Sequence, residues 1–238
     1  MGRLAGCKLD GPATVLKTPG VNLRQFVKYW LWRDTTHHGE FRAMWRLLPR
    51  DCPRLVVDVG ANDGFYGSNS FPFVARGWRA VLVEPHPKVF AKLQRLHRKK
   101  SQVTCLNLAC AENAGSFPLH VGDDGEAPST STLSDDPELL KTRTQGTLMV
   151  RVERLSDVLA AQQVPPDFGV LTVDVEGMDL EVLRGLDFSR WRPRVIITED
   201  YLPKFAAKAE WLQRNDYQLH TQIAGNSIWH PCRLAPAS

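Results

Sequence analysis

The sequence predicts a doubly wound α/β fold, with a mostly parallel sheet and a C-terminal antiparallel hairpin. From Arg54 onward, short apolar runs alternate with amphipathic stretches of helical periodicity, which is typical of parallel strands joined by helices. A glycine-rich turn follows the first apolar run, at the position where such sheets bind ligands. Two further alternating segments flank Gly225-Asn226, which favours a hairpin.

The first strand–helix units are expected between residues 55 and 108. Buried strands are predicted at 55–59, 80–83 and 103–108 because each stretch is short and apolar. Helices are expected over about 64–76 and 87–99, the second with Pro87 in its first turn, where proline is tolerated. This alternation implies right-handed crossovers between parallel strands.

An irregular region interrupts the alternation. The stretch 122–146 is rich in Asp, Ser, Thr and Pro, and a connection of this length is usually functional or disordered. Its serines and threonines at 129–132 suit a polyhydroxylated acceptor, so we expect a substrate cover, with a disordered insertion as the alternative. The other expected elements are half-exposed strands at 116–121 and 147–152, helices at 156–162, 180–186 and 204–214, buried strands at 170–175 and 194–198, and hairpin strands at 217–223 and 227–230.

We expect one domain over 51–238, preceded by an N-terminal helical extension over 1–50 that is a candidate lid. Apolar residues at three-and-four spacing predict a helix at 21–32, and a second short helix is expected at 39–48. The chain is free of internal repeats and of a linker that would divide it into two domains.

Composition narrows the class of protein. No apolar run approaches the roughly 18 residues that span a bilayer, and residues 1–10 lack the apolar core of a secretory signal. We therefore expect a cytoplasmic protein without a membrane partner. Five scattered cysteines without a C-x-x-C pair argue against a disulfide framework and a zinc site. The basic residues of 88–100 are interpreted as the solvated face of a helix rather than a phosphate site.

The turn after the first strand has the spacing Gly60-x-x-x-Gly64, with Asp58 two residues before the first glycine. A dinucleotide-binding turn would need a second glycine where this chain has Asn62. A carboxylate at position 58 would repel a pyrophosphate and suits a cationic ligand such as S-adenosylmethionine, which carries a sulfonium and an ammonium group. Glu84 ends the second strand and is placed to accept hydrogen bonds from ribose hydroxyls.

Several motifs together resemble the FkbM-type methyltransferases. The segment Val173-Asp-Val-Glu-Gly177 is the closest match, and Cys110 and Ala111 stand where Val and Ser are more usual in the family. The matching segments are 56–64, 82–87, 107–115, 131–133 and 173–177, the last continued to Gly185.

The resemblance implies a Rossmann-like class I methyltransferase fold and an O-methyltransferase that depends on S-adenosylmethionine. The acceptors in this family are often hydroxyls of sugars, glycans or secondary metabolites. The expected cofactor-binding residues are Asp58, Gly60, Ala61, Asn62, Gly64, Glu84, Pro85, Cys110, Ala111 and Asp174.

Acidic residues follow the later strands, at the edge where such sheets bind their ligands. Asp174, Glu176 and Glu199 are the expected catalytic residues, with Asp174 as the base that takes a hydroxyl proton or as a metal ligand. An Mg²⁺ ion held by Asp174, Glu199 and Asp200 is a further hypothesis, because hard oxygen ligands suit this ion. The alternatives are helix caps for Asp200 and Glu176. His37, His38 and His86 are secondary candidates for the site.

Three other functions fit the sequence less well. A nicotinamide-linked oxidoreductase conflicts with Asn62. An RNA methyltransferase is favoured by the alternating aromatic and basic residues of 28–33, but a packed helix explains that stretch equally well, and a net charge of +4 makes a nucleic-acid partner a weak expectation. A non-catalytic S-adenosylmethionine-binding protein conflicts with the acidic cluster. The sequence specifies neither the acceptor nor the oligomeric state.

Overall fold

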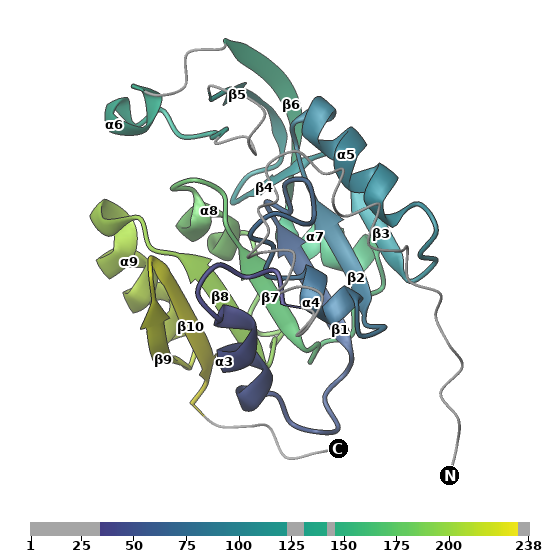
Figure 1. The fold of residues 1–238 in the computed structure, drawn as a ribbon. Helices are drawn as coiled ribbons and strands as arrows, with labels where there is room; N and C mark the ends of the chain where they lie inside the picture. The colour runs from purple at the N-terminus through teal and green to yellow at the C-terminus, as the bar shows by residue number, and fades with distance from the viewer. Residues whose placement is uncertain (1–33, 123–130, 142–145, 233–238) are drawn as a thin grey trace.

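The computed structural model describes residues 34–122, 131–141 and 146–232, so the helix expected at 21–32 lies outside the described residues. Its centre is a seven-stranded sheet with the order β3-β2-β1-β7-β8-β10-β9 (Figure 1). The strands are β1 (Leu55–Val59), β2 (Arg79–Val83), β3 (Val103–Leu106), β7 (Val170–Val173), β8 (Val195–Glu199), β9 (Tyr217–Ile223) and β10 (Asn226–Pro231).

The pairing of these strands confirms the expected fold class. Strands β3, β2, β1, β7 and β8 pair in parallel, whereas β10 is antiparallel to both β8 and β9. The hairpin turns at Ala224 and Gly225, whose φ angles of 45° and 93° lie in the left-handed region that tight hairpins require. The chain therefore has a mostly parallel sheet with a C-terminal antiparallel hairpin.

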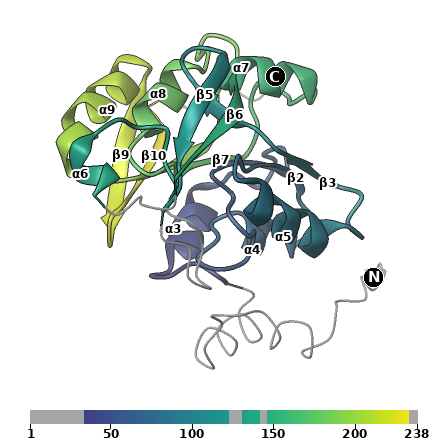
Figure 2. The ribbon, with the colours of Figure 1, turned by 90° about the horizontal axis from the view of Figure 1, so that it is seen from above.

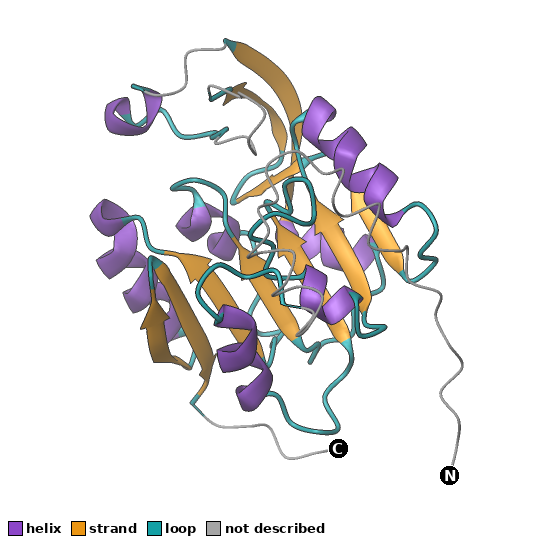
Figure 3. Ribbon diagram, viewed as in Figure 1, coloured by secondary structure: helices purple, strands orange, loops and turns teal. Residues whose placement is uncertain are grey.

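Helices cover both faces of the sheet (Figures 2 and 3). One face carries α3 (Glu40–Leu47), α4 (Phe71–Val74) and α5 (Pro87–His97), and the other carries α7 (Leu155–Ala161), α8 (Asp179–Arg184) and α9 (Leu202–Arg214). Side chains of a strand alternate between the two faces, so Val57 packs in the cluster under α7 and α8, whereas Val56 packs with α3 and α4. Burial on both sides explains why the parallel strands are continuous apolar runs.

A second, three-stranded sheet has the order β4-β6-β5 and stands beside the seven-stranded sheet (Figure 1). It contains β4 (Ala109–Ala111), β5 (Gly115–His120) and β6 (Thr147–Arg154). Strands β5 and β6 match the half-exposed strands that the alternation predicts, whereas β4 was not expected. The irregular region between them is described in part, and it contains the short helix α6 (Pro137–Leu140).

The prediction of a helix at 64–76 was wrong over its first half. The only helix that the described structure has in this segment is α4, which begins at Phe71. Asp63 Oδ1 accepts hydrogen bonds from the amides of Phe65 (2.8 Å) and Tyr66 (2.9 Å). These bonds fold the chain into a turn in which Gly64 and Gly67 have φ angles of 78° and 65°. A helix cannot continue through left-handed residues, so it begins only after the second of these glycines.

Helix α5 confirms the interpretation of the basic segment 88–100. Its Lys and Arg side chains face solvent, whereas Val89, Leu93 and His97 are buried. In the described ranges, no helix has both the length and the apolar character that a membrane span needs.

Buried His97 makes the stability of the fold depend on pH. Burial, with a smaller effect of Lys100, lowers the pKa of His97 to about 3. His97 therefore takes up a proton near pH 6.5 in the unfolded chain but only near pH 3 in the folded chain. Its contribution to stability is fully present above pH 6.5 and is lost as the pH falls below that value.

We expect His97→Leu to remove this dependence. Between pH 6.5 and 5, the free energy of unfolding of the unmutated chain should fall relative to the variant by about 1 kcal/mol per pH unit. Urea unfolding at a series of pH values measures the difference. Parallel curves for the two proteins would show that His97 is protonated as readily in the folded chain as in the unfolded one.

Candidate active site

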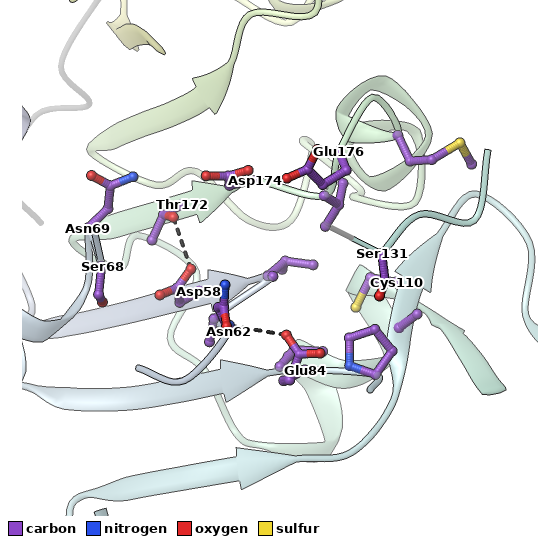
Figure 4. Close-up of a pocket in the computed structure, with 18 of the residues that line it drawn as sticks. Asp58, Asn62, Ser68, Asn69, Glu84, Cys110, Ser131, Thr172, Asp174 and Glu176 are labelled. Atoms are coloured by element: carbon purple, nitrogen blue, oxygen red, sulfur yellow. Dashed lines mark hydrogen bonds between the residues drawn. The ribbon is translucent and has the colours of Figure 1, made fainter. Parts of the chain in front are cut away.

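A cavity lies at the carboxyl ends of β1, β2 and β7 and is closed on one side by the small sheet (Figure 4). Its volume is about 360 Å³, within the usual range for small-molecule sites. The described lining residues are His37, Asp58, Val59, Gly60, Ala61, Asn62, Tyr66, Gly67, Ser68, Asn69, Val83, Glu84, Pro85, Ala109, Cys110, Leu119, Ser131, Leu133, Thr172, Asp174, Val175, Glu176 and Met178.

Gly60 brings the loop after β1 against the end of β7. The amides of Gly60 and Ala61 donate to the carbonyl of Val83 (3.0 and 2.9 Å), which turns the chain out of the sheet. Gly60 has a φ of 88°, and a Cβ at this position would lie 1.8 Å from the carbonyl oxygen of Asp174. Only glycine can adopt this backbone angle and lie this close to the Asp174 carbonyl. This explains why the motif has a glycine at position 60.

Glu84 is a buried carboxylate at the end of β2. Its oxygens accept hydrogen bonds from the amides of Asn62 (3.1 Å) and His86 (2.8 Å). Burial raises the pKa of Glu84 to about 7, against the lowering effect of these bonds. Because a carboxylate has about four acceptor positions, both oxygens can still accept a bond from a ligand in the cavity.

Asp58 is buried in β1 and faces its register partner Thr172 in β7. Its carboxylate accepts hydrogen bonds from the hydroxyls of Thr172 (3.0 Å) and Ser70. Burial raises the pKa of Asp58 to about 6, while the two hydroxyls lower it. The side chain therefore links the two central strands and also lies in the cavity wall (Figure 4).

Three carboxylates meet where β7 and β8 end. Asp174, Glu176 and Glu199 each offer an oxygen atom, and these atoms lie within 4.8 Å of one another. Glu176 and Gly177 have φ angles of 53° and 87°, which fold the chain back after β7. Burial, together with the negative charges of Asp179 and Glu176, raises the pKa of Asp174 well above its ordinary value.

The structure brings most of the expected site residues into the cavity and places four of them outside its lining. Gly64 faces α5, where a Cβ would lie 2.5 Å from Leu93 Cδ1, so this glycine serves packing. Asp200 turns away from the cluster of three carboxylates toward Ser227 Oγ (2.8 Å) and Gln222 Nε2 (2.9 Å). The other two are Ala111 and Glu199, and of these Glu199 still belongs to the carboxylate cluster.

Sequence reasoning missed several lining residues, among them Thr172, Ser68, Asn69 and Tyr66. Thr172 had a detectable signal, since it is the one polar residue of a four-residue apolar strand. Tyr66 lies within the turn at 63–67, where the periodicity predicts a helix, and Ser68 and Asn69 follow that turn. His37 was a secondary candidate, and it lies in the lining with its ring edge-on to Tyr66, at 5.2 Å between ring centres.

Part of the expected substrate cover contacts the acidic turn. Thr132 pairs with His120 of β5, and its hydroxyl donates to the carbonyl of Glu176 (2.8 Å). Its neighbours Ser131 and Leu133 line the cavity. Residues 129 and 130 lie outside the described residues.

The sequence is similar to those of known methyltransferases. It matches the family described as "Methyltransferase FkbM domain" over residues 58–219. It is 32% identical to methyltransferase sdnD of Sordaria araneosa over 179 residues, which cover 63% of this chain and 67% of sdnD.

Two solved methyltransferases align with most of the chain at low sequence identity. A methyltransferase from Geobacter sulfurreducens shares 13% identity over 94% of each chain, with a TM-score of 0.47. A precorrin-6y C5,15-methyltransferase from Geobacter metallireducens shares 12% identity over 80% of this chain and 87% of its own, with a TM-score of 0.44.

The family match extends from Asp58 in β1 to Leu219 in β9, so it includes the glycine turn, Glu84 and all three clustered carboxylates. It agrees with the sheet order and with the cavity at the carboxyl ends of the strands. This chain is therefore a methyltransferase of the FkbM-domain family, with a Rossmann-like α/β fold.

Proposed function

We propose that the chain transfers a methyl group from S-adenosylmethionine to a hydroxyl of a sugar, a glycan or a secondary metabolite. The position of Asp174 supports this function best. This carboxylate, whose pKa is raised, borders the same cavity as the glycine turn and Glu84. A base of this kind beside a methyl-donor pocket is what hydroxyl methylation needs, since a hydroxyl attacks poorly while it keeps its proton.

The residues of the cavity fit S-adenosylmethionine in charge and in shape. Among the described lining residues there is no Lys or Arg, whereas Asp58, Glu84, Asp174 and Glu176 are acidic, so the cavity suits a cationic ligand and repels phosphate. Gly60 and Ala61 line the cavity without a side chain larger than a methyl group, which leaves room for the ligand beside the turn. Glu84 would accept the ribose hydroxyls, and Pro85 and Cys110 would provide an apolar wall for the adenine. When bound, S-adenosylmethionine supplies an electrophilic methyl group on its sulfonium.

The protein's part in the reaction is to hold the acceptor and take its proton. Asp174 in its ionised form would accept the proton from the acceptor hydroxyl as the hydroxyl oxygen bonds to the methyl carbon and the bond from that carbon to the sulfonium sulfur breaks. Its raised pKa makes it a stronger base than an ordinary carboxylate. Asn69 and Ser131 offer hydrogen-bonding groups in the same cavity (Figure 4), and these would orient a polyhydroxylated acceptor.

A divalent cation is the second element of this proposal. The cluster of Asp174, Glu176 and Glu199 presents three hard oxygen ligands, the type that Mg²⁺ prefers. Glu176 thus takes the place that the sequence suggested for Asp200. A cation at this position would lower the pKa of a bound hydroxyl, so a weaker base at Asp174 would be enough to take its proton.

An RNA acceptor is disfavoured by the acidic lining of the cavity, because phosphates bind Lys and Arg. The aromatic and basic stretch at 28–33 lies outside the described residues. A non-catalytic S-adenosylmethionine-binding protein would leave the acidic cluster without a role.

We expect Asp174→Asn to lower the rate of methyl transfer by about a hundredfold or more, since general-base catalysis contributes about 10²–10⁴. The affinity for S-adenosylhomocysteine should change little. The rate is measured with labelled S-adenosylmethionine and a pool of monosaccharides and hydroxylated terpenes, and the affinity by calorimetry. Asp157→Asn makes the same chemical change at an exposed position in α7 and is the control. Full activity of Asp174→Asn would exclude it as the base.

Chelation tests the metal. We expect treatment with EDTA to reduce methyl transfer at least tenfold and added Mg²⁺ to restore it, because removing the cation leaves three carboxylates to repel one another. Unchanged activity after EDTA would exclude the cation and leave Asp174 as a base acting alone.

A further inference from the structure

A buried ion pair joins α8 and α9, two helices that cover the same face of the sheet (Figure 2). Asp179 is the first residue of α8, and Lys208 lies in the middle of α9. Their side chains are 5% and 3% exposed, and Lys208 Nζ lies 3.9 Å from Asp179 Oδ2. Neither residue lines the main cavity, so their role is separate from ligand contact.

Asp179 connects the ends of the two strands that lead to the cluster. Its Oδ1 accepts a hydrogen bond from the amide of Val175 (3.2 Å), and its Oδ2 accepts one from the amide of Glu199 (2.8 Å). Val175 stands between Asp174 and Glu176, and Glu199 is the third member of the cluster. The side chain of Asp179 therefore bonds to the backbone of Glu199 itself and to the backbone of Val175, the residue between Asp174 and Glu176.

Lys208 completes the connection from α9. Its Nζ donates to the carbonyl oxygen of Glu199 and lies 3.4 Å from Asp200 Oδ1. Asp200 is in turn held by the hydroxyl of Ser227 in β10. The amide and the carbonyl of Glu199 are thus bound by the two members of the pair, which fixes the backbone of this residue from both sides.

We propose that Asp179 and Lys208 are a positioning pair that holds the carboxyl ends of β7 and β8 together and so keeps Asp174, Glu176 and Glu199 at their mutual distances. The effect of the pair on methyl transfer rests on the proposed function. Its effect on the backbone at the two strand ends rests only on the hydrogen bonds of the structure. A buried ion pair contributes little net stability compared with apolar residues of the same size. Its bonds to these particular amides explain its presence better than stability does.

The test compares Asp179→Asn and Lys208→Met with Lys204→Met. Asn can accept a hydrogen bond through one oxygen only, so it must release one of the two amides. Lys204 is a matched control because it pairs with Glu181 at 2.9 Å, joins the same two helices and has no bond to either strand end. Amide hydrogen exchange is followed at Val175 and Glu199, with Leu82 in β2 as the reference amide.

We expect exchange to become at least tenfold faster at one of the two amides, Val175 or Glu199, in Asp179→Asn, and at Glu199 in Lys208→Met, with Leu82 unchanged in both. Methyl transfer to the pool of monosaccharides and hydroxylated terpenes should fall at least tenfold in kcat, while the Kd for S-adenosylhomocysteine stays within about threefold. Lys204→Met should change none of these quantities.

Equal acceleration at all three amides, or a kcat equal to that of the unmutated chain, would overturn the proposal and leave the pair a purely structural role. If the variants do not fold, exchange in the unmutated chain decides, because unprotected amides at Val175 and Glu199 would show that the bonds are not made. If the unmutated chain methylates nothing in the pool, the proposed acceptor class fails while the exchange measurements still decide the role of the pair.

Discussion

Gly60 approaches the carbonyl of Asp174 so closely that no other residue fits at this position. This contact forces the loop after β1 to lie against the end of β7. The glycine turn and Glu84 therefore share one cavity with Asp174 and Glu176. A donor and an acceptor can meet there only because two strands far apart in the sequence are neighbours in the sheet. The parallel pairing of β1 and β7, with apolar layers on both faces, supports this contact.

The cavity collects negative charge at a cost to stability. Burial raises the pKa values of Asp58, Glu84, Asp174 and Asp179, because a charged group loses its hydration when it is buried. Most of the partners of these carboxylates are neutral hydroxyls and backbone amides. A cationic ligand in the cavity would offset part of this cost, which ties the electrostatics of the site to the methyl donor proposed for it.

Much of the fold could be predicted from the sequence because local pattern decides it. The apolar runs at 55–59 and 170–173 are strands since they must be buried on both faces, and the hairpin at Gly225 follows from its turn residues. The late start of α4 could not be predicted, because it depends on Asp63 bonding to its own following amides rather than on apolar periodicity.

The sequence predicts which residues reach the cavity when their place at a strand end decides it. It predicts less well when the direction of the side chain decides whether a residue lies in the cavity. Asp58, Glu84 and Asp174 end or follow strands, so they must meet at one edge of the sheet. Asp200 also follows a strand, but Lys208, Ser227 and Gln222 draw its side chain away from the cavity. Gly64 belongs to the same motif as Gly60, yet it faces Leu93 in α5, a contact that sequence spacing does not reveal.

We propose that the cavity binds S-adenosylmethionine through the ionised carboxylate of Glu84. Calorimetry with S-adenosylhomocysteine at pH 6 and pH 8 tests it most directly, on the unmutated chain and on Glu84→Gln. Because burial raises the pKa of Glu84 to about 7, protonation at the lower pH removes an acceptor, and the affinity of the unmutated chain should be roughly tenfold weaker at pH 6 than at pH 8. Glu84→Gln should bind more weakly at pH 8 and lose most of this pH dependence. Equal affinities and equal pH dependence in the two proteins would contradict the claim.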